Sequence, residues 1–363
     1  MPNSSVERII IRGTNWLGDA VMTTPALRRL RSSFPAAHIV LLATPRTADL
    51  FIASSFVDEV ALYRRREEGV RAFTDAVRMM RRNRFDLALL FQNAFEAALL
   101  AWLGGAALRI GFAAEGRGTL LTHALHHTPE HRNRHQTQDY LDIVIAAERA
   151  CGLKIETTAA ASHPSITAAT THLAAAEALL QRHQITTREQ QLIALNAGAT
   201  NSRAKCWPED RFAALADRLI DNLNARVILI GAPSERDNAA RVIAQMKHAG
   251  AINLAGETSM TELIGVLDRC DLLITNDTGP AHIAAALGKP TLTIFGPTNE
   301  FETAPLGPRA EVIRAEGIQC ARCMHRDCPI DHRCMTRIAA DEVAERAMNL
   351  LRQTESEAHR RVK

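Results

Sequence analysis

Aromatic side chains are scarce in this chain: only 4% of its 363 residues are Phe, Trp or Tyr. Proteins that bind single-stranded nucleic acid stack the bases on such rings, so the scarcity argues against a nucleic-acid partner. The net charge of +3 is also too small for a general polyanion binder. No apolar run reaches the roughly 18–20 residues that a membrane-spanning helix needs, and no apolar leader precedes Arg8. We therefore expect a cytoplasmic protein that binds no nucleic acid.

Two motifs of nucleotide-using enzymes are also missing. No Asp-x-Asp pair, which holds the metal of many nucleotide-sugar transferases, occurs in the sequence, and no Gly-x-Gly-x-x-Gly follows a predicted strand. The turn from Gly13 to Asp19 has the glycine spacing of a P-loop. However, Asp19 and Ala20 replace the Lys and Ser/Thr of that motif, and a carboxylate there repels phosphate. Asp19 is then either an acidic residue that stabilises a helix start or a functional carboxylate at a rigid strand–helix junction.

Apolar runs of strand length alternate with helical patterns in two successive blocks, which predicts parallel sheets covered on both faces. The resulting fold class is α/β, with two Rossmann-like domains facing each other across a cleft at the carboxyl ends of their strands. Strands are expected at 8–12, 38–43, 57–62, 85–91, 107–111, 191–197, 226–231, 251–254, 271–275 and 291–295, and helices at 19–32, 136–151, 168–182 and 341–352. The expected domains are 1–165 and 191–340, with a linker at 166–190 and a C-terminal helix and tail at 341–363.

The most informative stretch is 272–290, where an apolar run ends in a polar turn and an alanine-rich helix begins at once. Helix N-termini present unpaired N–H groups and a partial positive charge, so they bind phosphate. Gly279 allows an anion to approach the backbone closely. Asp277, Thr278 and His282 surround that point. A helix start capped in the ordinary way is the alternative interpretation.

Two further strand ends in the second block carry similar chemistry. Thr200, Asn201 and Lys205 supply hydroxyl and amide donors and a point charge, all suitable for a diphosphate. Glu235 lies at a helix start after Gly231, where it can accept hydrogen bonds from ribose hydroxyls or serve as a first-turn acid behind Ser234. Three neighbouring turns of this kind predict a nucleotide-diphosphate site.

Seven cysteines, an odd number, fit a reducing compartment. Four of them follow the pattern Cys320-x2-Cys323-x4-Cys328-x5-Cys334. Such density is compatible with zinc or an iron–sulfur cluster, and also with reduced thiols or a reversible disulfide.

Basic residues cluster in the first 140 positions, as solvated helix faces or as a surface for an acidic acceptor or an anionic membrane. The clusters are Arg28, Arg29 and Arg31; Arg64–Arg66; Arg81, Arg82 and Arg84; and Arg132 and Arg134.

The segment from Asn15 to Leu27 resembles the N-terminal signature of the ADP-heptose:lipopolysaccharide heptosyltransferases, glycosyltransferase family 9, and is most similar to the heptosyltransferase II branch. The similarity continues, in the same order along the chain, through 109–112, 116–118, 200–208, 276–282 and 295–298.

This resemblance implies a GT-B fold and an inverting transfer of heptose from ADP-L-glycero-D-manno-heptose to the inner core of lipopolysaccharide. The implied partners are ADP-heptose and a lipid A-linked inner-core oligosaccharide, and no cofactor or catalytic metal is required. Peripheral contact with the cytoplasmic face of the inner membrane is left open. A GT-B nucleotide-sugar epimerase, or a heptosyltransferase acting on another acceptor, is the alternative.

The resemblance also implies roles for individual residues. Asp19 matches the general base, Lys205 a phosphate ligand and Glu235 a ribose contact. The residues implied to hold the sugar diphosphate are Asp277, Thr278, Gly279 and His282. Thr200 and Asn201 match a pair of hydroxyl residues near the phosphates, although Asn201 departs from the threonine expected there.

Overall fold

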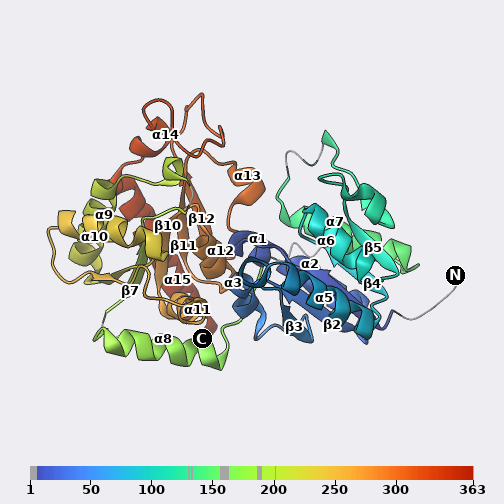
Figure 1. Ribbon diagram of the computed structural model, residues 1–363. Coiled ribbons are helices and arrows are strands. Elements are labelled where there is room, and N and C mark those ends of the chain that lie inside the picture. Colours follow the sequence, from blue (N-terminus) through green and yellow to red (C-terminus); the bar gives the residue numbers. More distant parts are fainter. Residues whose placement is uncertain are drawn as a thin grey trace. The chain divides into compact units, whose positions relative to one another are not determined.

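The computed structural model describes residues 6–129, 131, 134–155, 163–185, 190–200 and 202–362, with the backbone alone for 355–362. The chain divides into two compact units, Met1–Thr167 and Ala168–Lys363. Each unit is built on a six-stranded parallel sheet (Figure 1). The two-domain α/β fold class expected from the sequence is therefore confirmed.

The first unit has the strand order β3-β2-β1-β4-β5-β6, the order of a Rossmann fold. Its elements are β1 (Arg8–Arg12), α1 (Leu17–Met22), α2 (Thr24–Ser33), β2 (His38–Ala43), α3 (Pro45–Ala48), η1 (Asp49–Phe51), β3 (Glu59–Leu62), α4 (Arg65–Glu68), α5 (Val70–Asn83), β4 (Leu87–Leu90), α6 (Phe95–Leu103), β5 (Leu108–Phe112), η2 (Arg117–Leu120), β6 (His123–Leu125) and α7 (Thr137–Ala150).

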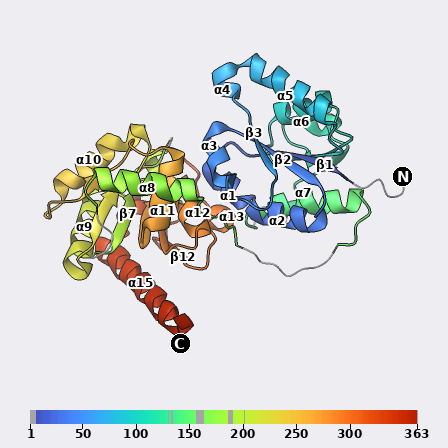
Figure 2. The ribbon, with the colours of Figure 1, turned by 90° about the horizontal axis from the view of Figure 1, so that it is seen from below.

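Successive side chains of each strand point to opposite faces of the sheet, and this alternation explains why helices cover both faces. Ile10, Val40 and Leu90 belong to one buried cluster with residues of α5 and α6. The intervening strand residues, such as Ile9 and Leu89, are fully buried too, so both faces of the sheet are covered. Figure 2 shows α5 and α6 on one side of these strands and α2 and α7 on the other.

The second unit has the order β12-β11-β10-β7-β8-β9, which is the same topology counted from β7. Its elements are α8 (Thr170–Arg182), β7 (Leu192–Asn196), η4 (Arg203–Lys205), α9 (Glu209–Leu223), β8 (Arg226–Leu229), η5 (Pro233–Glu235), α10 (Arg236–Gln245), β9 (Ile252–Asn253), α11 (Met260–Arg269), β10 (Leu272–Asn276), α12 (Gly279–Ala286), β11 (Thr291–Phe295), α13 (Glu300–Thr303), β12 (Ala310–Arg314), α14 (Arg333–Thr336) and α15 (Ala340–Val362).

Helix α8, which the sequence places in a linker, packs against α11 within the second unit. Gly265 of α11 makes this contact possible, because a Cβ atom there would lie 2.0 Å from the carbonyl oxygen of His172. The C-terminal helix α15 packs on α9. Its apolar residues Val343, Ala347 and Leu350 are buried in the core of its own unit.

The helix expected at 19–32 is in fact two helices, α1 and α2, separated at Thr23. Pro25 has no N–H to bond the carbonyl of Val21, and the hydroxyl of Thr24 donates to that carbonyl instead, at 2.9 Å. Two edge strands, β6 and β12, were not predicted. No helix in the described part of the chain combines the length and the apolar character that crossing a membrane requires.

Candidate functional site at the strand switch points

The second unit brings its predicted residues together where β7 and β10 lie side by side. These strands are neighbours in the sheet but lead to connections on opposite sides, and such a switch point is where open α/β sheets bind ligands. The ammonium of Lys205, from the loop after β7, donates to Oδ2 of Asp277, just after β10, at 2.7 Å. The hydroxyl of Thr298 donates to the same oxygen at 2.8 Å. Three separate strand ends thus meet at the Asp277 carboxylate.

A buried amide, Asn276, connects the two strand ends. Its Nδ2 donates to the carbonyl oxygens of Ala197 at 2.8 Å and Gly198 at 3.1 Å, and its Oδ1 accepts from the N–H of Trp207 at 3.0 Å. Because Trp207 is itself buried, these bonds fix both ends of the loop that carries Lys205.

Helix α12 begins at Gly279, two residues after Asp277. The hydroxyl of Thr278, the N-cap residue, does not cap the helix, since it contacts the hydroxyl of Thr275 at 3.0 Å and the amide of Asn196 at 3.2 Å. The helix start therefore keeps its positive end for an anion. His282 is buried on the first turn.

Glu235 is the last residue of the short helix η5, which follows β8, and its side chain contacts the loop that follows β7. Its Oε2 accepts from the N–H of Ala232 at 2.8 Å, and its Oε1 accepts from the hydroxyl of Thr200 at 3.1 Å. A Cβ atom on Gly198 would lie 2.3 Å from the Glu235 carboxyl carbon, so any other residue there would force the Glu235 side chain to move. A carboxylate accepts about four hydrogen bonds, so Glu235 retains capacity for a ligand hydroxyl.

Burial, together with the negative charges of Glu235 and Glu209, raises the pKa of the nearby Cys206 thiol to about 11. Cys206 is therefore a neutral thiol, not a nucleophile. Asn201, the remaining residue predicted for this site, lies outside the described residues.

In the first unit, Asp19 lies in the first turn of α1, after the end of β1. Burial raises the pKa of Tyr140 well above its usual range, and the negative charge of Asp19 adds to that rise. Tyr140, from α7, packs against Phe91 at the end of β4 with ring centroids 5.3 Å apart. Asp19 therefore lies on the connection that follows β1, a strand that pairs with β4.

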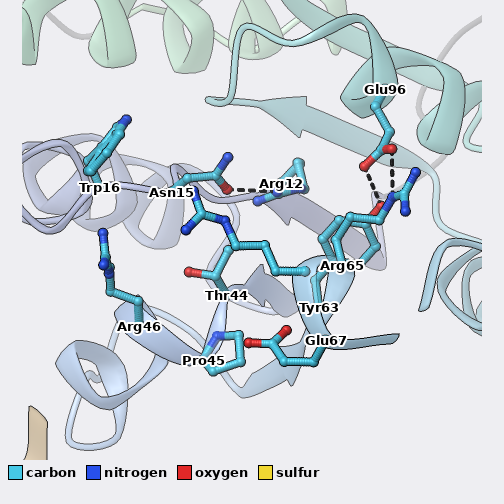
Figure 3. Close-up of a pocket in the computed structure, with 11 residues that line it drawn as sticks. Arg12, Asn15, Trp16, Thr44, Pro45, Arg46, Tyr63, Arg65, Glu67 and Glu96 are labelled. Carbon is cyan, nitrogen blue, oxygen red and sulfur yellow. Dashed lines mark hydrogen bonds and ion pairs between the residues drawn. The ribbon is translucent and has the colours of Figure 1, made fainter. Parts of the chain in front are cut away.

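A cavity of about 380 Å³ opens at the carboxyl ends of β1, β2 and β3 (Figure 3). Arginines dominate its charge. Its lining residues are Arg12, Asn15, Trp16, Thr44, Pro45, Arg46, Tyr63, Arg65, Arg66, Glu67 and Glu96.

Glu96 of α6 organises one wall of this cavity. It accepts from the hydroxyl of Tyr63 at 2.6 Å and from Nε of Arg65 at 2.8 Å. Burial opposes ionisation of Glu96, but these hydrogen bonds and the charges of Arg65 and Arg12 together lower its pKa. Glu96 is therefore an anion that already has two partners.

Arg12 is buried at the end of β1, and its guanidinium stacks 4.9 Å from the centre of the Tyr63 ring. It donates to Asn15 Oδ1 at 2.9 Å and to the carbonyl of Gly13. Burial lowers the pKa of Arg12 to about 10, against the opposing charges of Tyr63 and Glu96. The residue remains charged at neutral pH and holds the turn that leads to Asp19.

The basic clusters have different structural roles. Arg29 forms two hydrogen bonds of 2.7 Å to the buried Glu148, and Arg134 pairs with Asp139 and Asp142. Only Arg65 and Arg66, of the residues clustered in sequence, line the cavity. Arg132 lies outside the described residues.

Sequence reasoning missed several residues of both sites: Asn196, Asn276, Thr298, Arg12, Tyr63 and Glu96. A polar residue at the end of an apolar strand was the available signal, and it applies to Arg12, Asn196 and Asn276.

Two Rossmann-like domains in succession, the second with an uncapped helix start at its switch point, are the architecture of the GT-B glycosyltransferases. More particularly, the chain belongs to glycosyltransferase family 9 (heptosyltransferase), whose model matches residues 74–333.

The chain is similar over most of its length to named members of this family. Lipopolysaccharide heptosyltransferase 2 of Escherichia coli K12 is 26% identical over 326 residues, covering 85% of this chain and 88% of that protein. Lipooligosaccharide heptosyltransferase 2 of Campylobacter jejuni is 26% identical over 349 residues, covering 95% and 98%. The solved structure of the Escherichia coli ADP-heptose lps heptosyltransferase II superposes with a TM-score of 0.79 at 24% identity, covering 96% and 99%.

Proposed function

We propose that this glycosyltransferase transfers heptose from ADP-L-glycero-D-manno-heptose to the inner core of lipid A-linked lipopolysaccharide, with inversion at the anomeric carbon. The names of the similar proteins support heptose transfer to lipopolysaccharide or lipooligosaccharide. The name of the similar solved structure includes ADP-heptose, which supports the donor. The observation that carries the proposal is the meeting of Lys205, Asp277 and Thr298 beside the open start of α12.

The second unit, which contains the domain expected at 191–340, is proposed to bind the donor. Lys205 keeps two ammonium N–H donors after bonding Asp277, and these bind the diphosphate together with the hydroxyl of Thr200. Asn201, next in the sequence, is proposed as a further donor. Gly279 admits the phosphate to the start of α12, beside Thr278 and His282. Glu235 accepts from the ribose. ADP leaves as a stable anion, so this positive charge stabilises the leaving group without a metal ion.

The first unit, which contains the domain expected at 1–165, is proposed to bind the acceptor. Asp19 removes the proton of the acceptor hydroxyl as that oxygen attacks the face opposite the departing ADP. The arginine-lined cavity takes an acidic group of the acceptor. Arg46 and Arg66 are its available cations, because Arg65 is paired with Glu96. Peripheral contact with the cytoplasmic face of the inner membrane follows from a lipid-linked acceptor.

Product analysis tests this proposal directly. The purified protein is incubated with ADP-heptose and a truncated lipid-linked acceptor, and the products are identified by mass spectrometry and linkage determination. Transfer of one heptose with inverted configuration is expected. An isomerised sugar nucleotide without transfer would indicate an epimerase, and binding without any product would contradict an enzymatic role.

Asp19→Ala is expected to lower kcat at least about 100-fold while leaving the Kd for ADP nearly unchanged, because the carboxylate acts on the acceptor proton alone. Steady-state kinetics and calorimetric ADP titration measure the two quantities. Asp75→Ala, on the exposed side of α5, is the matched control. Near-normal turnover of the Asp19 variant would exclude the residue as base.

A further inference from the structure

The segment 320–334, here termed the cysteine strap, has an unusual backbone. It lies between β12 and α15, and the short helix α14 is its only regular element. Three of its non-glycine residues, Arg322, Met324 and His332, have φ between 57° and 63°, in the left-handed region. Such conformations are costly for side-chain-bearing residues and persist where surrounding interactions impose them.

The strap is bonded directly to the loop that carries Lys205. The N–H of Ala204 donates to the carbonyl of Arg326 at 2.9 Å, and Nε2 of His332 lies 2.6 Å from the carbonyl oxygen of Ala204. Arg203 and Asp327 add an exposed ion pair at 2.8 Å. The position of Lys205 therefore depends on the conformation of the strap.

The strap also contacts the turn that supplies Thr298. The N–H of Met324 donates to the carbonyl of Pro297 at 2.9 Å. Nε of Arg322 donates to Glu300 Oε2 at 3.1 Å, at the start of α13. Two of the three strand ends that meet at Asp277 are thus supported by this one segment.

The strap carries four thiols. All four cysteines are free, and Cys334 is buried. Burial raises the pKa of the Cys334 thiol, and Cys328, Cys323 and Cys320 add to that rise. The N–H of His332 donates to the sulfur of Cys328 at 3.2 Å, the kind of bond that supports a metal-bound thiolate.

We propose that Cys320, Cys323, Cys328 and Cys334 bind one thiolate-preferring transition-metal ion, zinc(II) or iron(II), which fixes the strap against the Lys205 loop. Four sulfur ligands with a Cys-x2-Cys pair are typical of a tetrahedral structural site, and they suit both ions. Arg322, within that pair, and Met324, just after it, have left-handed backbone conformations. An ion bound by the sulfurs of Cys320 and Cys323 would hold the backbone in these conformations.

Another group of possible ligands fits less well. Among the described residues, His127, His131 and Asp139 are the set whose donor atoms already lie within 4.8 Å of one another. However, Nδ1 of His131 accepts from the N–H of Thr128 at 2.9 Å, and Arg134 already pairs with Asp139. The four sulfurs do not yet form so tight a set, so the ion has to draw them together.

Metal analysis of the full-length protein is the first test. Protein purified without chelator is expected to hold about one zinc or iron ion per chain by elemental analysis, which also identifies the ion. Cobalt(II) added to the metal-free protein should give thiolate-to-metal charge-transfer absorption. The double variant Cys323→Ser/Cys328→Ser should lose at least about 90% of the metal, whereas the control Cys151→Ser, in the first unit, should keep it. A wild-type protein that neither holds nor takes up an ion would overturn the site.

The link to the donor loop rests on the proposed function and is tested separately. Removing the ion from wild-type protein with a chelator should weaken ADP binding about 10-fold or more, and restoring the ion should reverse this change. This reversible comparison remains informative if the double variant does not fold. Unchanged ADP affinity after metal loss would overturn the positioning role. No ADP binding by the metal-loaded wild type would instead contradict the donor proposal and leave the metal site standing.

Discussion

Lys205 and Asp277 are 72 positions apart in the chain, yet their charged atoms are 2.7 Å apart. The carboxylate is almost fully buried, with 7% of its side chain exposed, whereas Lys205 is 27% exposed. If one partner of a buried ion pair is removed, the other charge stays buried without an opposite charge. The loss of folding free energy is then larger than the net stabilisation that the pair contributes. The lysine therefore both stabilises the site and presents a charge to the donor.

Lys205→Ala is expected to weaken ADP binding and to cost about 2–4 kcal/mol in the transition state, because one donor to the leaving diphosphate is lost. Calorimetric titration with ADP and kcat/KM for the transfer reaction measure these effects. Arg269→Ala is the matched control, since Arg269 is 41% exposed and pairs with the half-exposed Glu177 on α8, away from the donor loop. Equal losses from both substitutions would contradict a specific role for Lys205.

At the scale of elements, the central strands were predictable because they are buried on both faces and read as continuous apolar runs. The predicted bounds of β1, β2 and β11 match the structure to the residue. The edge strands β6 and β12 lack that signal: His123 and Ala124 of β6 are exposed, and that strand has only three residues. Their pairing depends on a neighbouring strand, which local sequence does not encode.

The same distinction applies to the sites. The polar turns after β7, β8 and β10 were predictable, since each follows an apolar run directly. The cavity of the first unit was not, because it depends on side chains from separate elements. Arg12, Tyr63 and Glu96 are brought together only when β1, β3 and α6 take their places. Of the arginines in that cavity, Arg46 and Arg12 lie outside every sequence cluster.

The hydrogen bonds of Glu96 join α6 to β3 and α4, and they predict a pH dependence of stability. The folded-state pKa of Glu96 is lowered, so its stabilisation is complete above the unfolded pKa of about 4.3 and is lost as the pH falls through the folded value. Glu96→Gln should therefore reduce the free energy of unfolding by about 1 kcal/mol at pH 7, and by less below about pH 4. Urea denaturation at both pH values measures this difference.

Glu68→Gln is the control for this experiment, because Glu68 makes only a 3.9 Å pair with Arg64 on the surface of α4. A difference between wild type and Glu96→Gln that stays constant down to pH 3 would show that ionised Glu96 does not stabilise the fold.

At the scale of the whole molecule, each unit has its own parallel sheet and its own buried core. Helix α8, before β7, and helix α15, after β12, both pack within the second unit. The described residues proposed to bind ADP, including Thr200, Lys205 and Glu235, all belong to that unit. Donor binding should then be a property of the second unit alone, whereas transfer requires both.

A fragment spanning residues 168–363 is therefore expected to fold and to bind ADP with a Kd within about threefold of the full-length value, while transferring no heptose, because Asp19 is absent. Circular dichroism, ADP titration and the transfer assay measure these three properties. ADP at about 100 times its Kd should raise the free energy of unfolding of the fragment by about 2.7 kcal/mol. The fragment carrying Lys205→Ala is the control and should gain little. A folded fragment that fails to bind ADP would mean that the first unit contributes donor contacts, and the division of labour proposed for the two domains would have to be abandoned.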